Sequence, residues 1–325
     1  MFDSFAVDVG VAYDYLLQPD DNATLPLAPS ETPFANTERT TYQLSPKGGF
    51  VWTPARDTTV RGAFTRSLSG FAAGQSDRLE PTEVAGFNQA FTSLVPEAIV
   101  GDTSGSRFDT MDLLIEKKFD SGTYLSLAGE ILHGKVEQLA GDYLSDEYAS
   151  YLSPINEIIS YPAGMRREVD YMERNLTFTV DQLLGRQWTV GGRYRISKAD
   201  ADINYVQVNG ANLIPNGSVF QNLQNLDSVL QTINLHANWN HPSGLFSILE
   251  SNWYHQSNRG YSPAEPGDDF WQFNAYAGWR FWHRRAEVSV GLLNLFDQNY
   301  SLEPLNLYNE MARSRTFLAR LLITF

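Results

Sequence analysis

The sequence predicts an all-β transmembrane barrel whose strands run antiparallel and up-and-down. Long segments of alternating character, short connections that alternate with long ones, and an aromatic last strand predict it. Successive side chains of a strand point to opposite faces, so alternation separates a lipid face from a wet face. In residues 317–325, Arg320 and Thr324 share the wet face. The lipid face there carries Phe317, Ala319, Leu321, Ile323 and Phe325.

Alternating segments bounded by Gly, Pro, Asn and Asp clusters mark about twelve strands. They are expected at 4–16, 40–53, 59–68, 108–119, 123–134, 169–181, 187–198, 228–240, 245–256, 269–281, 286–295 and 314–325. These strands are longer than the five or six residues usual in soluble sheets, and they match a tilted membrane crossing.

The connections alternate strictly in length. Short turns are expected at 54–58, 120–122, 183–187, 241–244 and 282–285, and long loops near 17–39, 69–107, 135–168, 199–227, 257–268 and 296–313. Outer-membrane barrels combine short periplasmic turns with long extracellular loops, which would put both ends of this chain on the periplasmic side. An extracellular β-sandwich or β-solenoid is the soluble alternative, but it has no reason to gather every long loop at one end.

The composition excludes several classes of protein. No run approaches 18 apolar residues, so a helical membrane span is excluded. The net charge of -14 argues against a nucleic-acid partner, and the absence of cysteine excludes disulfides and thiolate sites. The first residues lack a basic n-region and an apolar h-region. We therefore expect that a signal peptide has been removed or that the chain is a fragment, and we favour a fragment.

The C-terminal hairpin carries a distinctive motif. Residues 290–300 read VGLLNLFDQNY, and their N-L-F-D-x-x-Y pattern begins with Asn294, Leu295, Phe296 and Asp297. Arg315 then leads into a last strand that ends on Phe325. This arrangement resembles the end of a TonB-dependent outer-membrane receptor. The segments LSPKGGFVWTP at 44–54 and TTVRGAFTRS at 58–67 resemble the mid-barrel hairpin of that family. Residues 79–83 weakly resemble a post-loop L-x-P-E segment, after which the expected strand comes late.

The resemblance implies that residues 1–325 are the C-terminal portion of a receptor barrel, without the N-terminal plug domain or the signal peptide. Family barrels have about 22 strands, so the chain is either a part of such a wall or a shortened relative. The resemblance also implies that Phe325 is the signal recognised by the barrel-assembly machinery. TonB would be reached only through the missing plug. Asn294 and Asp297 are expected to satisfy backbone groups where the strand leaves the membrane.

Polar side chains on the wet faces of three strands are the candidate lumen lining. They are expected to form a mixed, hydrogen-bonding wall rather than a defined pocket, with His236 opposite Glu250 as an ionic contact or part of a permeation path. The candidates are Arg193, Arg195, Asn234, His236, Asn238, Gln272 and Asn274. Ligand capture is expected from loop aromatics such as Tyr143, Tyr148, Tyr151 and Tyr161.

Neither a metal, a cofactor nor a catalytic centre is expected. The histidines have no metal-binding spacing, and phosphate-loop and nucleophile-elbow motifs are absent. Acidic loop residues offer oxygen ligands for Ca²⁺, but they lack the spacing of a dedicated calcium loop, so we expect them to be solvated loop charges. They are Asp142, Asp146, Glu147, Asp200 and Asp202. An outer-membrane phospholipase would use His255 with Ser251 or Ser257, but the spacing shows no orienting group.

The expected function is therefore that of a receptor or transporter in a Gram-negative-type outer membrane, for TonB-dependent uptake of an unidentified solute. Outer-membrane lipid, the assembly machinery and a small-molecule ligand are the expected partners. The alternatives are a passive porin or exporter barrel without a plug, and a surface-binding scaffold.

Overall fold

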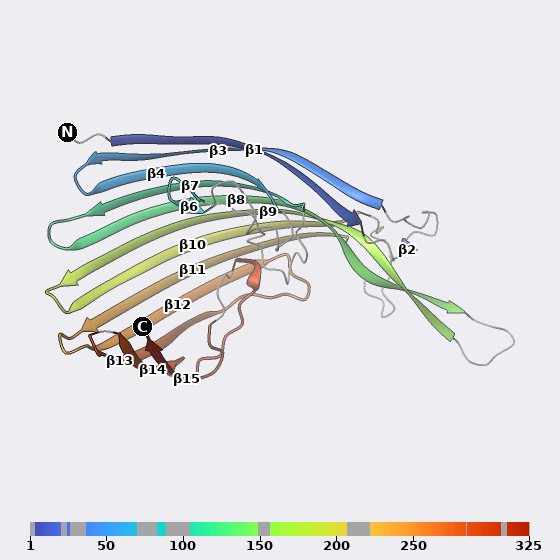
Figure 1. Ribbon diagram of the computed structural model, residues 1–325. Helices are drawn as coiled ribbons and strands as arrows, with labels where there is room; N and C mark the ends of the chain where they lie inside the picture. Colours follow the sequence, from blue (N-terminus) through green and yellow to red (C-terminus); the bar gives the residue numbers. More distant parts are fainter. Residues whose placement is uncertain are drawn as a thin grey trace.

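The computed structural model describes residues 4–20, 25–26, 37–69, 83–88, 105–148, 157–206, 222–283, 285–306 and 311–324. Twelve long strands follow one another in a single antiparallel up-and-down sheet (Figure 1). They are β1 (Ser4–Asp20), β3 (Thr37–Ala55), β4 (Thr58–Leu68), β7 (Arg107–Lys118), β8 (Thr123–Tyr148), β9 (Glu157–Leu184), β10 (Trp188–Tyr205), β11 (Leu223–Asn240), β12 (Leu245–Arg259), β13 (Asp269–Phe281), β14 (Ala286–Leu293) and β15 (Thr316–Ile323).

The smaller elements lie against this sheet. β2 (Leu25–Pro26) pairs in parallel with β9, and β5 (Glu83–Val84) and β6 (Phe87–Asn88) form a separate hairpin. A 3₁₀ turn, η2 (Pro304–Asn306), lies in the connection between β14 and β15. Among the described residues, no helix is long and apolar enough to cross a membrane.

The predicted all-β, up-and-down fold is confirmed, and each of the twelve expected strands is present. Four of the expected loops, 17–39, 135–168, 199–227 and 257–268, are wrong in extent, because strand pairing continues into them. β8 and β9 stay paired from Thr123 opposite Gln182 to Tyr148 opposite Glu157, so most of the expected loop 135–168 is a long hairpin. In the same way β10 and β11 pair beyond the expected boundaries, as far as Asn204 opposite Leu223.

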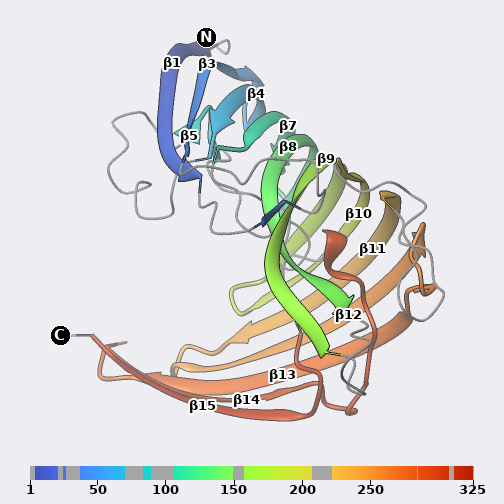
Figure 2. The ribbon, with the colours of Figure 1, turned by 90° about the vertical axis from the view of Figure 1, so that its right-hand side faces the viewer.

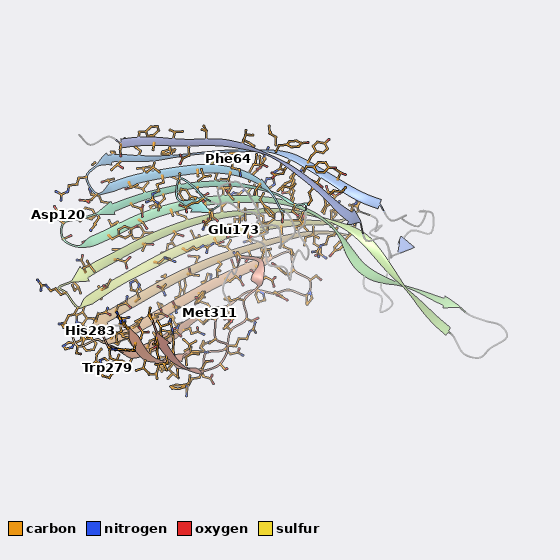
Figure 3. All side chains as sticks on the ribbon, in the orientation of Figure 1. Phe64, Asp120, Glu173, Trp279, His283 and Met311 are labelled. Carbon is orange, nitrogen blue, oxygen red and sulfur yellow. The ribbon has the colours of Figure 1, made fainter. Side chains whose placement is uncertain are left out.

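The short turns all lie at one end of the sheet. Figure 3 shows Asp120 and His283, from two of these turns, at the same end of the strands. At the turn before β12, Gly244 has φ +91°, and a Cβ there would lie 2.0 Å from the carbonyl oxygen of Arg280. Only glycine fits this close approach between the turn before β12 and the backbone of β13, and glycine also adopts the positive φ without strain.

The sheet is strongly curved and open on one side (Figure 2). β1 and β15 each pair with one neighbour among the described strands, so these twelve strands do not close on themselves. The convex face is apolar: Trp271 and Trp279 are 42% and 46% exposed there, and among the described strands no second sheet covers them. The concave face carries the polar side chains and the buried ones.

A buried cluster occupies the concave face of the central strands. Phe108, Leu132, Val169, Tyr171 and Ala199 come from four consecutive strands, β7 to β10, and all are almost completely buried. Their shared partner is Leu305, which lies far from them in the sequence and is fully buried. The connection between β14 and β15 therefore enters the concavity, where Figure 2 shows η2 beside the central strands.

Candidate functional site

The register brings the predicted lumen residues to one face. Arg193 lies opposite Asn234, and His236 opposite Glu250, which in turn lies opposite Asn274. Because positions two apart share a face, all seven candidates lie on the concave side of β10, β11 and β13. They are Arg193, Arg195, Asn234, His236, Asn238, Gln272 and Asn274. That this face lines a transport path stays a prediction.

The ionic partner of His236 differs from the expected one. Its Nε2 lies 3.0 Å from Asp181 Oδ1, while Glu250 accepts a hydrogen bond of 3.2 Å from Asn274 Nδ2. The reason is Gly191, which lies between β9 and β11 directly opposite Asp181 and His236. A Cβ on Gly191 would lie 2.0 Å from Asp181 Oδ1, so the missing side chain lets the pair meet across β10.

A buried carboxylate lies at the centre of the concave face. Glu173 on β9 is fully buried and appears near the middle of the sheet in Figure 3. It accepts hydrogen bonds from Tyr171 Oη at 2.6 Å, Ser197 Oγ at 2.9 Å and Arg195 at 3.3 Å. A buried carboxylate requires such partners, because an unpaired charge is costly away from water. Sequence reasoning missed Glu173, although the alternation of β9 places it on the same face as Tyr171.

We call residues 294–315 the inner loop, of which 294–306 and 311–315 are described. The side chain of Asn306 binds the inner loop to the concave wall. The Oδ1 atom accepts hydrogen bonds from Ser228 Oγ and Gln256 Nε2, and Nδ2 donates to the carbonyl oxygens of Ser197 and Ser228, all four at 3.2 Å. Tyr171 Oη donates to the Leu305 carbonyl oxygen at 3.1 Å.

Two glutamines of the wall hold the backbone of the inner loop. Gln256 receives the Glu303 N–H at 2.7 Å and donates to the Glu303 carbonyl at 2.9 Å. Gln272 donates to the Ala312 carbonyl at 2.9 Å. Both glutamines are 2% exposed. The loop expected at 296–313 as an extracellular loop thus folds inward in its described parts, and Gln272 contacts protein backbone there.

A column of aromatic rings also joins the wall to the inner loop. Phe270 of β13 stacks on Tyr254 of β12, with ring centroids 5.4 Å apart, and on Tyr300 of the inner loop, at 5.3 Å. The Arg313 guanidinium lies 5.2 Å from the centroid of the Tyr300 ring. Stacked rings add stability beyond the area they bury, so this column fixes the inner loop at a second place.

The residues of the N-L-F-D pattern close the base of the inner loop. Asn294 has φ +51° and is fully buried, and its side chain bonds the backbone of Gln298 at both N–H (2.7 Å) and C=O (2.8 Å). Asp297 Oδ1 accepts the Arg315 N–H at 2.8 Å, and Arg315 Nε donates to the Leu295 carbonyl at 3.1 Å. Phe296 packs edge-on against Phe273, with centroids 5.3 Å apart.

Several predicted residues lie outside what the structure describes. Phe325 and Tyr151 are not among the described residues, and the side chains of Tyr143, Tyr148, Tyr161, Asp142, Asp146 and Glu147 are not described either. Asp200 pairs with Lys198 at 3.0 Å and with Arg174 at 3.1 Å. No group of three or more acidic or histidine side chains suited to a metal occurs in the described part of the chain.

His255 lies on the convex face beside Asp269, with Nδ1 and Oδ2 3.0 Å apart. An orienting carboxylate is therefore present, which the sequence did not reveal. No hydrogen bond joins His255 to Ser251 or Ser257, all three of which the structure describes.

Comparison with known proteins gives low similarities. No protein-family model and no curated protein matches the chain. Among solved structures, the ferric-catecholate import receptor Fiu from Escherichia coli K12 matches at a TM-score of 0.38 and 11% identity, over 90% of this chain and 47% of the receptor. The toluene transporter TodX from P. putida matches at a TM-score of 0.21 and 10% identity, over 90% and 82%. The chain thus spans about half of the Fiu receptor. Both similarities are too low to carry an argument about function.

Proposed function

We propose that residues 1–325 are the C-terminal part of the wall of an outer-membrane receptor or transporter that takes up a solute by a TonB-dependent route. The convex face of the sheet carries this proposal. On β1 alone, Val7, Val9 and Val11 are 56%, 83% and 66% exposed. Soluble proteins rarely expose apolar patches of more than a few hundred Å². Hydrocarbon is the environment in which such a face is stable, since the ten strands from β3 to β14 satisfy their backbones through a neighbour on each side.

The TonB-dependent part of the proposal is supported by the sequence motifs alone. The N-L-F-D-x-x-Y pattern, followed by Arg315 and the aromatic C-terminal strand, resembles the end of that receptor family. In this proposal outer-membrane lipid contacts the convex face, and the barrel-assembly machinery recognises the last strand. TonB acts through a plug region that these residues do not include.

A passive porin or exporter is the second candidate, and the inner loop favours it. A loop bound to the inside of a wall narrows a pore without any plug. The two functions differ in conductance, since an unplugged wall passes ions continuously.

The experiment is to purify the native protein from outer membranes and to measure its conductance in planar bilayers. Solute depletion from the growth medium is compared between wild-type cells, cells lacking this protein and cells lacking TonB. Outer-membrane fractionation, near-zero conductance and an uptake lost in both deletions are expected. A steady open conductance with uptake independent of TonB would establish the porin instead, and recovery in the soluble fraction would refute both.

A further inference from the structure

A cavity of about 330 Å³ lies on the concave face beside Asn306 of the inner loop. Its walls come from β10, β11 and β12, and Asn306 of the inner loop closes one side. Ligand sites for small molecules start at about this volume. The polar residues around it include Arg193, Arg195, Thr232, Asn234, Asn252 and Tyr254.

One arginine beside the cavity, Arg193, is exposed. Among the described residues it has neither an ion-pair nor a hydrogen-bond partner. Arg195, two residues along, is committed to Glu173 and to Asn175, at 3.3 and 3.0 Å. The two arginines therefore differ: one holds the wall together, and the other faces the cavity.

The nearby carboxylates have partners other than Arg193. Glu173 accepts three hydrogen bonds, Asp181 contacts His236 at 3.0 Å, and Glu250 accepts from Asn274 at 3.2 Å. The guanidinium of Arg193 is consequently available to an anion in the cavity. In a chain of net charge -14, a local cation is needed if an anion is to bind at all.

Further hydrogen-bonding groups of the cavity are also unused by the described protein. The hydroxyls of Thr232 and Tyr254 have no hydrogen-bond partner there, and Asn234 Nδ2 uses only the oxygen of Asn252, which leaves Asn252 Nδ2 free. Hydroxyls and amides bind the hydroxyl groups of a solute, while a guanidinium binds a carboxylate with two parallel hydrogen bonds.

We infer that this cavity is a binding site for a small hydroxylated organic anion, whose carboxylate is held by Arg193 and whose hydroxyl groups meet Thr232, Asn252 and Tyr254. The assignment of this anion as transported solute rests on the proposed function. The binding itself does not, because it requires only the folded wall and the inner loop.

The test measures malate binding to the purified native protein in detergent by isothermal titration calorimetry. The variant is Arg193→Gln, and the matched control is Arg186→Gln, which removes the same charge at the exposed turn between β9 and β10. The dimethyl ester of malate controls for the carbon skeleton. Wild type and Arg186→Gln are expected to bind malate, Arg193→Gln to bind about tenfold or more weakly, and the ester not to bind.

Absence of malate binding to the wild type, or equal affinity of wild type and Arg193→Gln, would overturn the site. Because Arg193 is exposed, the variant is expected to fold, and circular dichroism checks this. A protein that binds malate through Arg193 but shows no uptake would refute the transport proposal and leave the site intact. Solute uptake by a protein that does not bind malate would refute the site and leave the transport proposal intact.

Discussion

Asn306→Ala is expected to release the inner loop from the concave wall while leaving the sheet intact. The Asn306 side chain makes four hydrogen bonds to Ser197, Ser228 and Gln256, each of 3.2 Å. At this length each contributes about 0.5–1 kcal/mol net, so their loss costs about 2–4 kcal/mol. The sheet itself does not depend on them, because its strands pair with one another through their own backbones.

Hydrogen exchange in detergent micelles measures this release. A docking free energy lower by about 2–4 kcal/mol raises the exchange rate of the inner-loop amides by roughly 30- to 900-fold. The Glu303 amide, held by Gln256 at 2.7 Å, is the reporter. Asn299→Ala is the control, since Asn299 is exposed and its side-chain oxygen bonds only the adjacent Tyr300 N–H. Equal protection of the Glu303 amide in wild type and in Asn306→Ala would refute the argument that Asn306 anchors the loop.

Three further predictions concern the pH, the two faces and the glycine of the wall. Burial, and then the neighbouring Glu265, raise the pKa of Glu303 from 4.5 to about 7. The protonated form of Glu303 therefore favours docking of the inner loop, and docking weakens as the pH rises from 4.5 through 7. Hydrogen-exchange rates of the loop amides, corrected for their intrinsic pH dependence, should rise over this range. In Glu303→Gln the pH dependence of docking should be lost. Leu249→Arg, on the convex face, should lower the free energy of unfolding by about 2–4 kcal/mol, measured by urea unfolding from lipid vesicles. The adjacent Ile248→Arg, on the concave face, should lower it clearly less. Equal losses in the two variants would contradict the assignment of the faces. Gly191→Ala should separate Asp181 from His236, because its Cβ would lie 2.0 Å from Asp181 Oδ1. We expect the melting temperature of this variant to fall below that of the wild type. Gly192→Ala is the control and should lower the melting temperature less.

The strands were predictable because a period of two is visible in any one segment. In the last strand, Phe317, Leu321 and Ile323 lie on the exposed convex face and Arg320 on the other, as the alternation requires. The extent of the β8–β9 hairpin was not predictable in this way. There each strand satisfies the backbone of the other beyond the edge of the sheet, and the polar residues of the hairpin resemble a loop in composition.

The candidate site shows a similar division. Alternation placed Arg193 and Arg195 on one face, but it could not tell which of them is paired. That difference depends on Glu173, which lies across the sheet on β9, and on Asn175 beside it. The contact between His236 and Asp181 was equally unpredictable, because it passes over Gly191 of β10 and joins β11 to β9, which are not neighbouring strands. Pairwise register predicts opposite residues, whereas side chains also reach across a glycine.

The inward course of the inner loop was the feature least predictable from the sequence. The polar composition of the loop explains both why it folds inward and why this was not predicted. A segment rich in Asn and Gln indicates a solvated loop, since amides are well hydrated. The same amides can replace water on a wall whose side chains need hydrogen bonds, as Asn306 does for Ser228 and Gln256. An apolar loop would leave those wall groups unpaired at a cost of about 1–3 kcal/mol each. Leu305 meets an apolar patch, and it is fully buried there. The polarity of a loop therefore does not decide whether it faces solvent; the groups that await it on the wall do.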